Sequence, residues 1–465
     1  MERRTLVESL MISGEIEVKT SKVYWKSIII FLTFSLNPFL MALSKAINLS
    51  GMIPFSVLII FISLLFYYLN SVILNACTLS RATTYSELFN NYFHRMDRIV
   101  NLAVFLYGFF YICLVQVAVL ITILASYREI FGYDSQISLY VLIPLLCVFS
   151  FCMILLSWSQ ELKEYYKACI VSLILLIFTV LGGSVVIATH RENVSALIDC
   201  ENYYFNGDFY LSVYILLVVV NIFQSLTLIY KDIRDSNLVL KRELYEQALK
   251  IALIITVCFY LLFGFMMSFT ERITSSRSPG PEEFNLMFVL LCIFRLFKFT
   301  WFILQVCLMM LTLKSSFLSI FSSSDYEISS RMSLLLSAIF IFLSNAAIYY
   351  VYTRPSDQRT YQRYGGIGCY SNEAYDEDFD FNEDDDYDPQ PYEDLNLMYY
   401  AGHQLFMVNA YFSIIVGLII PWGLMIRTTN YSQAKIAIVA VGILIVLVLV
   451  VYSSFYEKNE FYFPV

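Results

Sequence analysis

Eleven long apolar stretches constrain the fold of this chain more than any other feature. We predict membrane-spanning helices at approximately residues 27–50, 52–77, 99–125, 136–157, 166–188, 208–230, 247–269, 285–313, 331–352, 402–426 and 435–455. Each stretch has the roughly 20 residues that cross a ~30 Å hydrocarbon core. Only 15% of the 465 residues are charged, whereas about a quarter are charged in a soluble domain. The predicted fold class is therefore an all-α polytopic membrane protein.

The segments outside these stretches leave no room for a separate soluble domain. We expect an N-terminal tail of residues 1–26, a transmembrane domain of residues 27–455 and a C-terminal tail of residues 456–465. The N-terminal tail mixes both charge signs and has no apolar core, so it is neither a signal peptide nor a transit peptide. The first spanning helix is expected to act as the insertion signal. Residues 80–98 are predicted to contain a short amphipathic surface helix.

The distribution of Lys and Arg predicts the orientation in the membrane. One set of connections carries 19 Lys and Arg residues and the opposite set carries 8. The basic set comprises the N-terminal tail and the loops near residues 80–98, 158–167, 231–250, 314–331 and 427–435. Because basic loops stay in the cytoplasm, we expect a cytoplasmic N-terminus and a C-terminus outside or in a lumen. Both the plasma membrane and a vacuolar or lysosomal membrane are compatible with this topology.

Three residues on the predicted outer side bear on chemical modification. Asn193 begins an Asn-Val-Ser sequon in the loop after the fifth span, and it is a predicted glycosylation site. Cys200 and Cys369 lie in two loops on the same oxidising side. A disulfide between them and a pair of free thiols are the two alternatives.

An acidic loop at residues 353–400 accounts for the net charge of −8. Its segment 372–394 has 12 acidic residues and no basic residue. A calcium-binding EF-hand loop needs Gly at its sixth position and Glu at its twelfth, but these positions, counted from Asp376, are Phe381 and Tyr387. We expect a disordered, solvated loop that attracts cations by its charge, and no metal site or cofactor.

The first span contains a helix breaker beside polar residues. Pro38 cannot donate to the helical ladder and disfavours helical geometry at Asn37. Thr33 and Ser35 precede this pair. The two interpretations are a simple proline kink whose freed groups bond to hydroxyls, and a broken helix that exposes its backbone to a ligand.

The sixth span contains a second polar cluster. Asn221, Gln224 and Ser225 share one helix face because they are spaced three and four residues apart. This face is expected to contact protein, water or ligand, since buried amides need partners. Interhelical hydrogen bonding is the alternative, as it is for the single amides at Gln116 and Asn345. Breaks in the first and sixth helices of two five-helix halves are typical of inverted-repeat transporters, whose substrate binds at the breaks.

Four short motifs resemble those of the amino acid/auxin permease family, which includes sodium-coupled neutral and vacuolar amino acid transporters. They are IYKDIRDSN (229–237), TTYSELFNNYF (83–93), ALSKAINLSG (42–51) and LTLKSSF (311–317). The resemblance covers nearly the whole chain. It implies a 5+5 inverted repeat, with helices one to five at about residues 27–188, helices six to ten at about residues 208–426, and an eleventh helix at about residues 435–455.

The resemblance also implies site residues. A substrate amino acid would contact Ser35, Asn37 and Pro38 in helix one, and Asn221, Gln224 and Ser225 in helix six. The family's glycine-rich break falls on residues 37–41, and the aromatic motif of helix six falls on residues 218–223 without its His. Its sodium-site positions fall on Thr33 and Gln305, with Thr300 nearby, so the implied coupling ion is H⁺ or Na⁺, and uncoupled transport remains an alternative.

The predicted function is amino acid transport by alternating access, with the amino acid and the lipid bilayer as the partners. The alternative is a sensor that binds amino acids on a transporter fold without moving them. The three His residues lie in or beside loops, and hydrolase, metalloprotease and P-loop motifs are missing from the sequence, so we expect no enzymatic activity. Nothing in the sequence predicts nucleic-acid binding, and the oligomeric state stays open.

Overall fold

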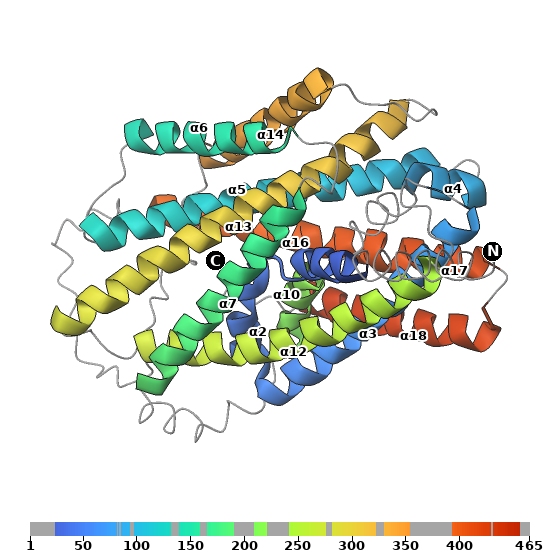
Figure 1. Ribbon diagram of the computed structural model, residues 1–465, viewed down its shortest axis with the longest axis horizontal. Helices are drawn as coiled ribbons and strands as arrows, with labels where there is room; N and C mark the ends of the chain where they lie inside the picture. The colour runs from blue at the N-terminus through green and yellow to red at the C-terminus, as the bar shows by residue number, and fades with distance from the viewer. Residues whose placement is uncertain are drawn as a thin grey trace, which may run out of the picture.

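The computed structural model describes residues 24–80, 82, 85–93, 97–131, 139–158, 165–189, 209–220, 241–275, 281–321, 330–353, 393–428 and 431–455. Every regular element in these ranges is helical (Figure 1). The elements are the helix Tyr24–Ser35, η1 (Pro38–Met41), α2 (Ala42–Ser50), α3 (Met52–Ser80), α4 (Tyr85–Phe93), α5 (Asp97–Phe131), α6 (Leu139–Leu156), α7 (Tyr166–Thr189), η3 (Phe209–Leu211), α10 (Ser212–Val219), α12 (Lys241–Ser275), α13 (Pro281–Phe321), α14 (Ser330–Thr353), α16 (Glu393–Ile414), η5 (Ile415–Ile419), α17 (Ile420–Arg427) and α18 (Gln433–Phe455).

This architecture confirms the predicted class of all-α polytopic membrane protein. Within the described residues, seven helices are long and apolar enough to cross a membrane, and three further apolar helices are shorter. Each of the eleven predicted stretches coincides with at least one helix. The N-terminal tail, most of the acidic loop, the C-terminal tail, Asn193, Cys200 and Cys369 lie outside the described residues.

Several helices extend beyond the predicted apolar stretches. Helix α12 begins at Lys241 and α16 begins at Glu393, which is inside the segment predicted as an acidic loop. Charged residues end an apolar stretch without ending a helix, because the backbone hydrogen bonds of the helix continue into the polar interface. The hydropathy pattern therefore located the apolar part of each helix and missed its polar ends.

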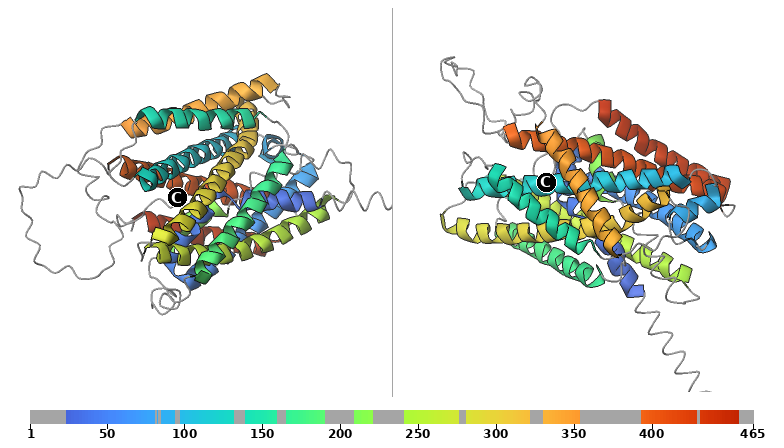
Figure 2. Two further views of the ribbon diagram at one scale, coloured as in Figure 1. Left: turned by 60° about the vertical axis from the view of Figure 1, so that its left-hand side comes forward. Right: turned by 90° about the horizontal axis from the view of Figure 1, so that it is seen from above.

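The helices form a bundle around α10 and the two halves of helix one (Figures 1 and 2). Helix α10 contacts α2, α3, α16 and α18, and its eight side chains are all buried. Helix α5 packs against α13, α14 and α16 on one side of this centre, while α12 packs against α2, α3 and α7 on the other. The helices at the centre of the bundle therefore contact helices from both halves of the chain.

The periphery of the bundle carries the most exposed apolar side chains. Helices α6 and α14 lie side by side at one edge (Figure 2), and α18 lies at another. On α18, Ile438 is 71% exposed and Leu444 is 58% exposed. Such apolar surfaces are compatible with the hydrocarbon of a bilayer, which solvates side chains of this kind.

A glycine fixes the contact between α3 and the π-helix η5. A Cβ atom added at Gly417 would lie 2.4 Å from Cε1 of Phe66, whereas one added at Gly423 would lie 3.6 Å from its nearest neighbour. Position 417 therefore has no room for a side chain while Phe66 stays in place.

A buried lysine joins three helices at one end of the bundle. The Lys314 side chain of α13 is 2% exposed, and its Nζ donates to the Ser157 carbonyl at 2.7 Å and to Ser333 Oγ at 2.8 Å. Ser157 directly follows α6, and Ser333 lies in the first turn of α14. The ammonium thus holds α13, α14 and the end of α6 together through neutral acceptors.

Candidate functional site at the helix-one break

Helix one is interrupted in the middle of the bundle. The helix Tyr24–Ser35 ends with a backbone bond from the Leu36 N–H to the Leu32 carbonyl, and Asn37 is extended with φ −78° and ψ 166°. The chain then resumes as η1, whose first residue is Pro38. The break follows from the sequence, because Pro38 supplies no N–H and its ring pushes Asn37 out of helical geometry.

Asn37 replaces part of the backbone bonding that the break removes. Its Oδ1 accepts from the Phe39 N–H at 3.0 Å, so the side chain caps the second half of helix one. Its Nδ2 donates to the carbonyls of Val218 at 3.2 Å and Val219 at 2.9 Å. One buried amide therefore bonds to three backbone groups, and it joins helix one to α10.

The hydroxyls of Thr33 and Ser35 turn back onto their own helix. Thr33 Oγ1 donates to the Ile29 carbonyl at 2.9 Å, and Ser35 Oγ donates to the Phe31 carbonyl at 2.7 Å. This is the local bonding expected of a proline-broken helix. The backbone carbonyls at both positions accept from other helices, and the Thr33 side chain also hydrogen-bonds Cys169 of α7.

Tyr260 of α12 bridges the two broken ends. Its hydroxyl lies 2.5 Å from the Ser35 carbonyl oxygen and 3.0 Å from the Val219 carbonyl oxygen. The Tyr260 side chain is 0% exposed. Ser35 ends the first half of helix one and Val219 ends α10, so the carbonyl ends of two helices meet at one hydroxyl.

Gln305 of α13 contacts the same half of helix one. Its Nε2 donates to the Thr33 carbonyl at 2.8 Å, while its Oε1 is buried with no partner among the described residues. The two positions that the family resemblance assigns to an ion site are therefore in direct contact. Thr300, five residues earlier on α13, is exposed and is not part of this buried cluster.

Aromatic rings surround Phe39 in the second half of helix one. The ring centroid of Phe39 lies 5.6 Å from that of Tyr111, 6.5 Å from that of Phe302 and 5.8 Å from that of Phe406. The Tyr111 hydroxyl and both amide atoms of Gln116 are buried without a partner in the described part of the chain. Unpaired buried polar atoms of this kind are costly, and the ring of Tyr111 is in contact with Phe39 next to the break.

Part of the predicted site falls on residues that the structure does not describe. Asn221, Gln224 and Ser225 lie outside the described residues, which stop at Val220 in this region. Asn345, by contrast, joins α14 to α6 by donating to Ser150 Oγ at 2.9 Å, as expected for interhelical bonding. Sequence reasoning missed Tyr260 and Tyr111, because a Tyr within an apolar span carries no signal of what its hydroxyl touches.

The fold and the broken helix define a class of protein, a polytopic membrane protein with a transporter fold. Its structure is similar to crystal structures of a manganese transporter from Eremococcus coleocola. The complex of that protein with an aromatic bis-isothiourea substituted compound matches with a TM-score of 0.53 and 11% sequence identity. The alignment covers 93% of this chain and 94% of the other.

Two variants of the same transporter match with a TM-score of 0.54 each, at the same identity and coverage. No family profile and no curated protein sequence matches this chain. The likeness at 11% identity shows the transporter fold, over nearly the whole length of both chains, and leaves the substrate to be argued from the site.

Proposed function

We propose that this chain is a secondary transporter that moves an amino acid across a membrane by alternating access. The substrate binds where the breaks of helices one and six meet, and the chain catalyses no chemical reaction. The observation that carries the proposal is the meeting of two half-helix carbonyl ends at Asn37 and Tyr260. In transporters with broken helices, such ends lie at the substrate site near the middle of the membrane.

The chemistry of these ends favours an ammonium group. The carbonyl end of a helix carries a partial negative charge, roughly half an elementary charge. The Ser35 and Val219 carbonyls both lie at such ends, so a primary ammonium can donate to both in place of the neutral donors there. The substrate carboxylate would then face the amide-bearing segment of helix six, where Asn221, Gln224 and Ser225 are the predicted contacts.

The residue types at the break favour an amino acid over a metal ion. A divalent cation such as Mn²⁺ is bound in proteins mainly by carboxylates, carbonyls and imidazoles. Among the described residues, no group of three or more His, Cys, Asp and Glu side chains could hold a metal. Residues 221–231 add no acidic residue and no His. The side chains at the break are amides and hydroxyls, which suit a zwitterion that carries its own charges.

Thr33 and Gln305 are the proposed ion-coupling residues. The Gln305 Oε1 atom is an unoccupied acceptor beside the Thr33 carbonyl, and Na⁺ is coordinated by oxygen atoms of this kind. A proton is the other proposed coupling ion. We propose the cytoplasmic N-terminus predicted from the Lys and Arg distribution as the orientation of this carrier.

Uptake into liposomes tests the proposal. Purified full-length protein is reconstituted and offered radiolabelled amino acids, and separately Mn²⁺, under imposed pH or sodium gradients. We expect uptake of at least one amino acid that is driven by one gradient. Mn²⁺ uptake without amino acid uptake would refute the substrate assignment, and amino acid binding without uptake would establish the sensor alternative.

Two Tyr→Phe variants, compared in the same assay, test where the site lies. Tyr260→Phe removes the neutral donor that the ammonium has to displace, so it should raise the apparent affinity for the amino acid by up to about tenfold, the equivalent of about one hydrogen bond. Tyr452→Phe makes the same chemical change on the surface of α18, where the side chain is 45% exposed. Equal affinity in the two variants would remove the break from the proposed site.

A further inference from the structure

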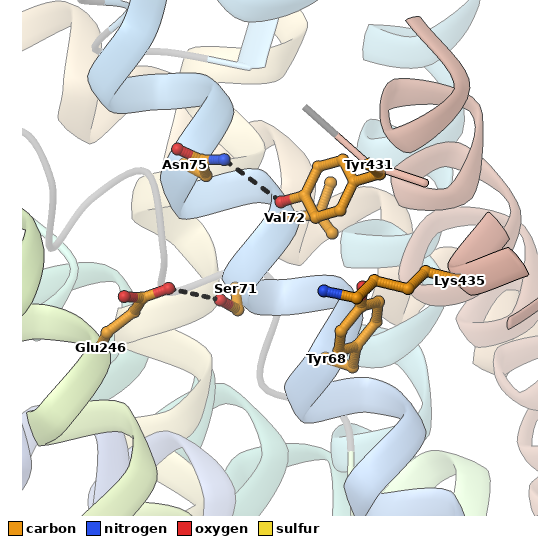
Figure 3. A pocket seen from close by; sticks show the side chains of 7 residues that line it. All are labelled: Tyr68, Ser71, Val72, Asn75, Glu246, Tyr431 and Lys435. Atoms are coloured by element: carbon orange, nitrogen blue, oxygen red, sulfur yellow. Dashed lines mark hydrogen bonds between the residues drawn. The ribbon is translucent and has the colours of Figure 1, made fainter. Parts of the chain in front are cut away.

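A polar pocket of about 480 Å³ lies on the bundle surface, away from the helix-one break. It is lined by residues of α3, α12, α18 and the segment just before α18 (Figure 3): Tyr68, Ser71, Val72, Asn75, Glu246, Tyr431 and Lys435. Glu246 and Tyr260 are fourteen residues apart on α12, which is about 21 Å along a helix. The pocket is therefore a second site, distinct from the one proposed for transport.

The pocket has opposite charges on opposite sides. Figure 3 shows Glu246 on the α12 side and Lys435 on the α18 side, with α3 between them. Ser71 donates to one carboxylate oxygen of Glu246 at 3.0 Å, and this leaves the second oxygen as an acceptor for a ligand. A ligand that matches this arrangement carries both a cation and an anion.

The floor and rim add neutral polar and aromatic groups. Asn75 Nδ2 donates to the Tyr431 hydroxyl at 3.2 Å, while Asn75 Oδ1 is buried without a partner among the described residues. The Asn75 side chain is 5% exposed. The rings of Tyr68 and Tyr431 meet edge to face with centroids 6.5 Å apart, and such rings attract an ammonium group over their faces.

The pocket lies at the ends of three membrane-spanning helices. Asn75 is close to the end of α3 at Ser80, Glu246 is close to the start of α12 at Lys241, and Lys435 is in the first turn of α18. Glu246 and Lys435 are each the third residue of an apolar span, Leu244–Ser268 and Gln433–Ser453, and Asn75 is five residues from the end of the span Met52–Ser80. These positions therefore lie near the depth at which lipid headgroups meet the hydrocarbon.

Exposed apolar rows lead from the pocket toward the other side of the membrane. On α3, Leu64, Ile60 and Val57 continue the face of Tyr68 and Ser71 at helical spacing, and they are 54%, 41% and 62% exposed.

On α18, Ile438, Val441 and Ile445 continue from Lys435 with exposures of 71%, 56% and 45%. Because α3 ends at the pocket and α18 starts there, both rows run away from the pocket in the same direction. A polar pocket with apolar rows attached to it matches an amphiphile.

We propose that the pocket binds the headgroup of a zwitterionic membrane phospholipid. The phosphate contacts Lys435, the ammonium contacts Glu246 and the two Tyr rings, and the acyl chains lie along the exposed rows of α3 and α18. A soluble zwitterion shares the headgroup chemistry but uses none of the apolar surface, and this surface is the reason for choosing the lipid.

Native mass spectrometry of the purified full-length protein in detergent tests the proposal. The probe is palmitoyl-oleoyl phosphatidylethanolamine, added at increasing concentration. We expect a retained lipid adduct whose apparent Kd rises about tenfold in Lys435→Gln and in Glu246→Gln, because each variant loses a charge-assisted hydrogen bond. Lys167→Gln, an equally exposed lysine at the start of α7, should leave the Kd unchanged.

Two further probes separate the chemical contributions. Palmitoyl-oleoyl phosphatidylglycerol has the chains and the phosphate without the ammonium, and glycerophosphoethanolamine has the headgroup without the chains. Both should bind at least about tenfold more weakly than the complete lipid. Equal binding of phosphatidylglycerol would overturn the role of Glu246, and equal binding of glycerophosphoethanolamine would make the occupant a soluble zwitterion.

The variants are chosen to keep the fold. Lys435 is exposed, and Gln at position 246 can still accept from Ser71. Thermal unfolding of each variant verifies that the protein is intact before the lipid is added. If both variants melt like the unmodified protein and still retain the lipid with an unchanged Kd, the pocket is not the lipid site.

Discussion

Replacement of Asn37 is the sharpest test of the helix-one break. The side chain donates to the carbonyls of Val218 and Val219 and accepts from the Phe39 N–H, and Asn37→Ala removes all three bonds. A net contribution of about 0.5–1.5 kcal/mol for each bond gives a loss of about 1.5–4.5 kcal/mol. If the break must keep this geometry to carry substrate, the uptake rate falls by about 10-fold to 1000-fold.

A serine at the same position separates the contribution of the helix cap from that of the bonds to α10. Ser caps a helix start about as well as Asn, so Asn37→Ser keeps the bond to Phe39 and loses only the two bonds to α10. The expected loss is then about 1–3 kcal/mol, and uptake by the Ser variant should lie between that of Asn37→Ala and that of the unmodified protein. An Ala variant more active than the Ser variant would contradict the role of the cap.

The assay is amino acid uptake into liposomes, normalised to the amount of folded protein recovered. Asn345→Ala is the matched control, since it also removes an amide that joins two helices, but a partly buried one between α14 and α6. Its uptake should stay within about threefold of the unmodified rate, because it loses one bond outside the break. The reasoning fails if Asn37→Ala and Asn345→Ala transport at the same rate per folded protein.

Two further predictions concern the stability of the bundle. Gly417→Ala should lower the free energy of unfolding by about 1–3 kcal/mol, because the new methyl group overlaps Phe66; Gly423→Ala, with open space around it, should be neutral or stabilising, and thermal unfolding in detergent compares the two. Lys314→Ala should lower the unfolding midpoint because its buried acceptors lose their donor. The double variant Lys314→Ala/Ser333→Ala should be destabilised by less than the sum of the two single variants, because both single changes remove the same Lys314–Ser333 hydrogen bond. Additive destabilisation would show that this bond contributes nothing.

The apolar spans and the break in helix one could both be predicted from sequence, and for local reasons. Hydropathy is a property of each stretch alone, so each of the eleven stretches contains at least one helix among the described residues. The conformation of Asn37 is fixed by the Pro that follows it. The family resemblance paired Thr33 with Gln305, and the structure places these two residues in contact. Their role in ion coupling stays a prediction.

The residues that sequence reasoning missed depend on contacts between distant helices. Tyr260 is one more aromatic residue in an apolar span, and only its position beside two helix-end carbonyls distinguishes it from Tyr214, whose hydroxyl donates to the Val450 carbonyl. The pocket between Glu246 and Lys435 combines side chains nearly two hundred positions apart. The residue pattern of one segment cannot predict which side chains of distant helices line the same pocket.

The neutral donors at the break bear on the return half of a transport cycle. A carrier that has released its cargo must reorient empty, and two helix ends of the same partial sign then face each other without a counter-charge. The Asn37 amide and the Tyr260 hydroxyl already give hydrogens to these oxygens. Under the proposed function, these neutral donors occupy the place of the substrate ammonium when no substrate is bound. An arriving ammonium would displace them because charge-assisted bonds are roughly twice as strong, and its departure would leave no bare charge to hold the carrier in place.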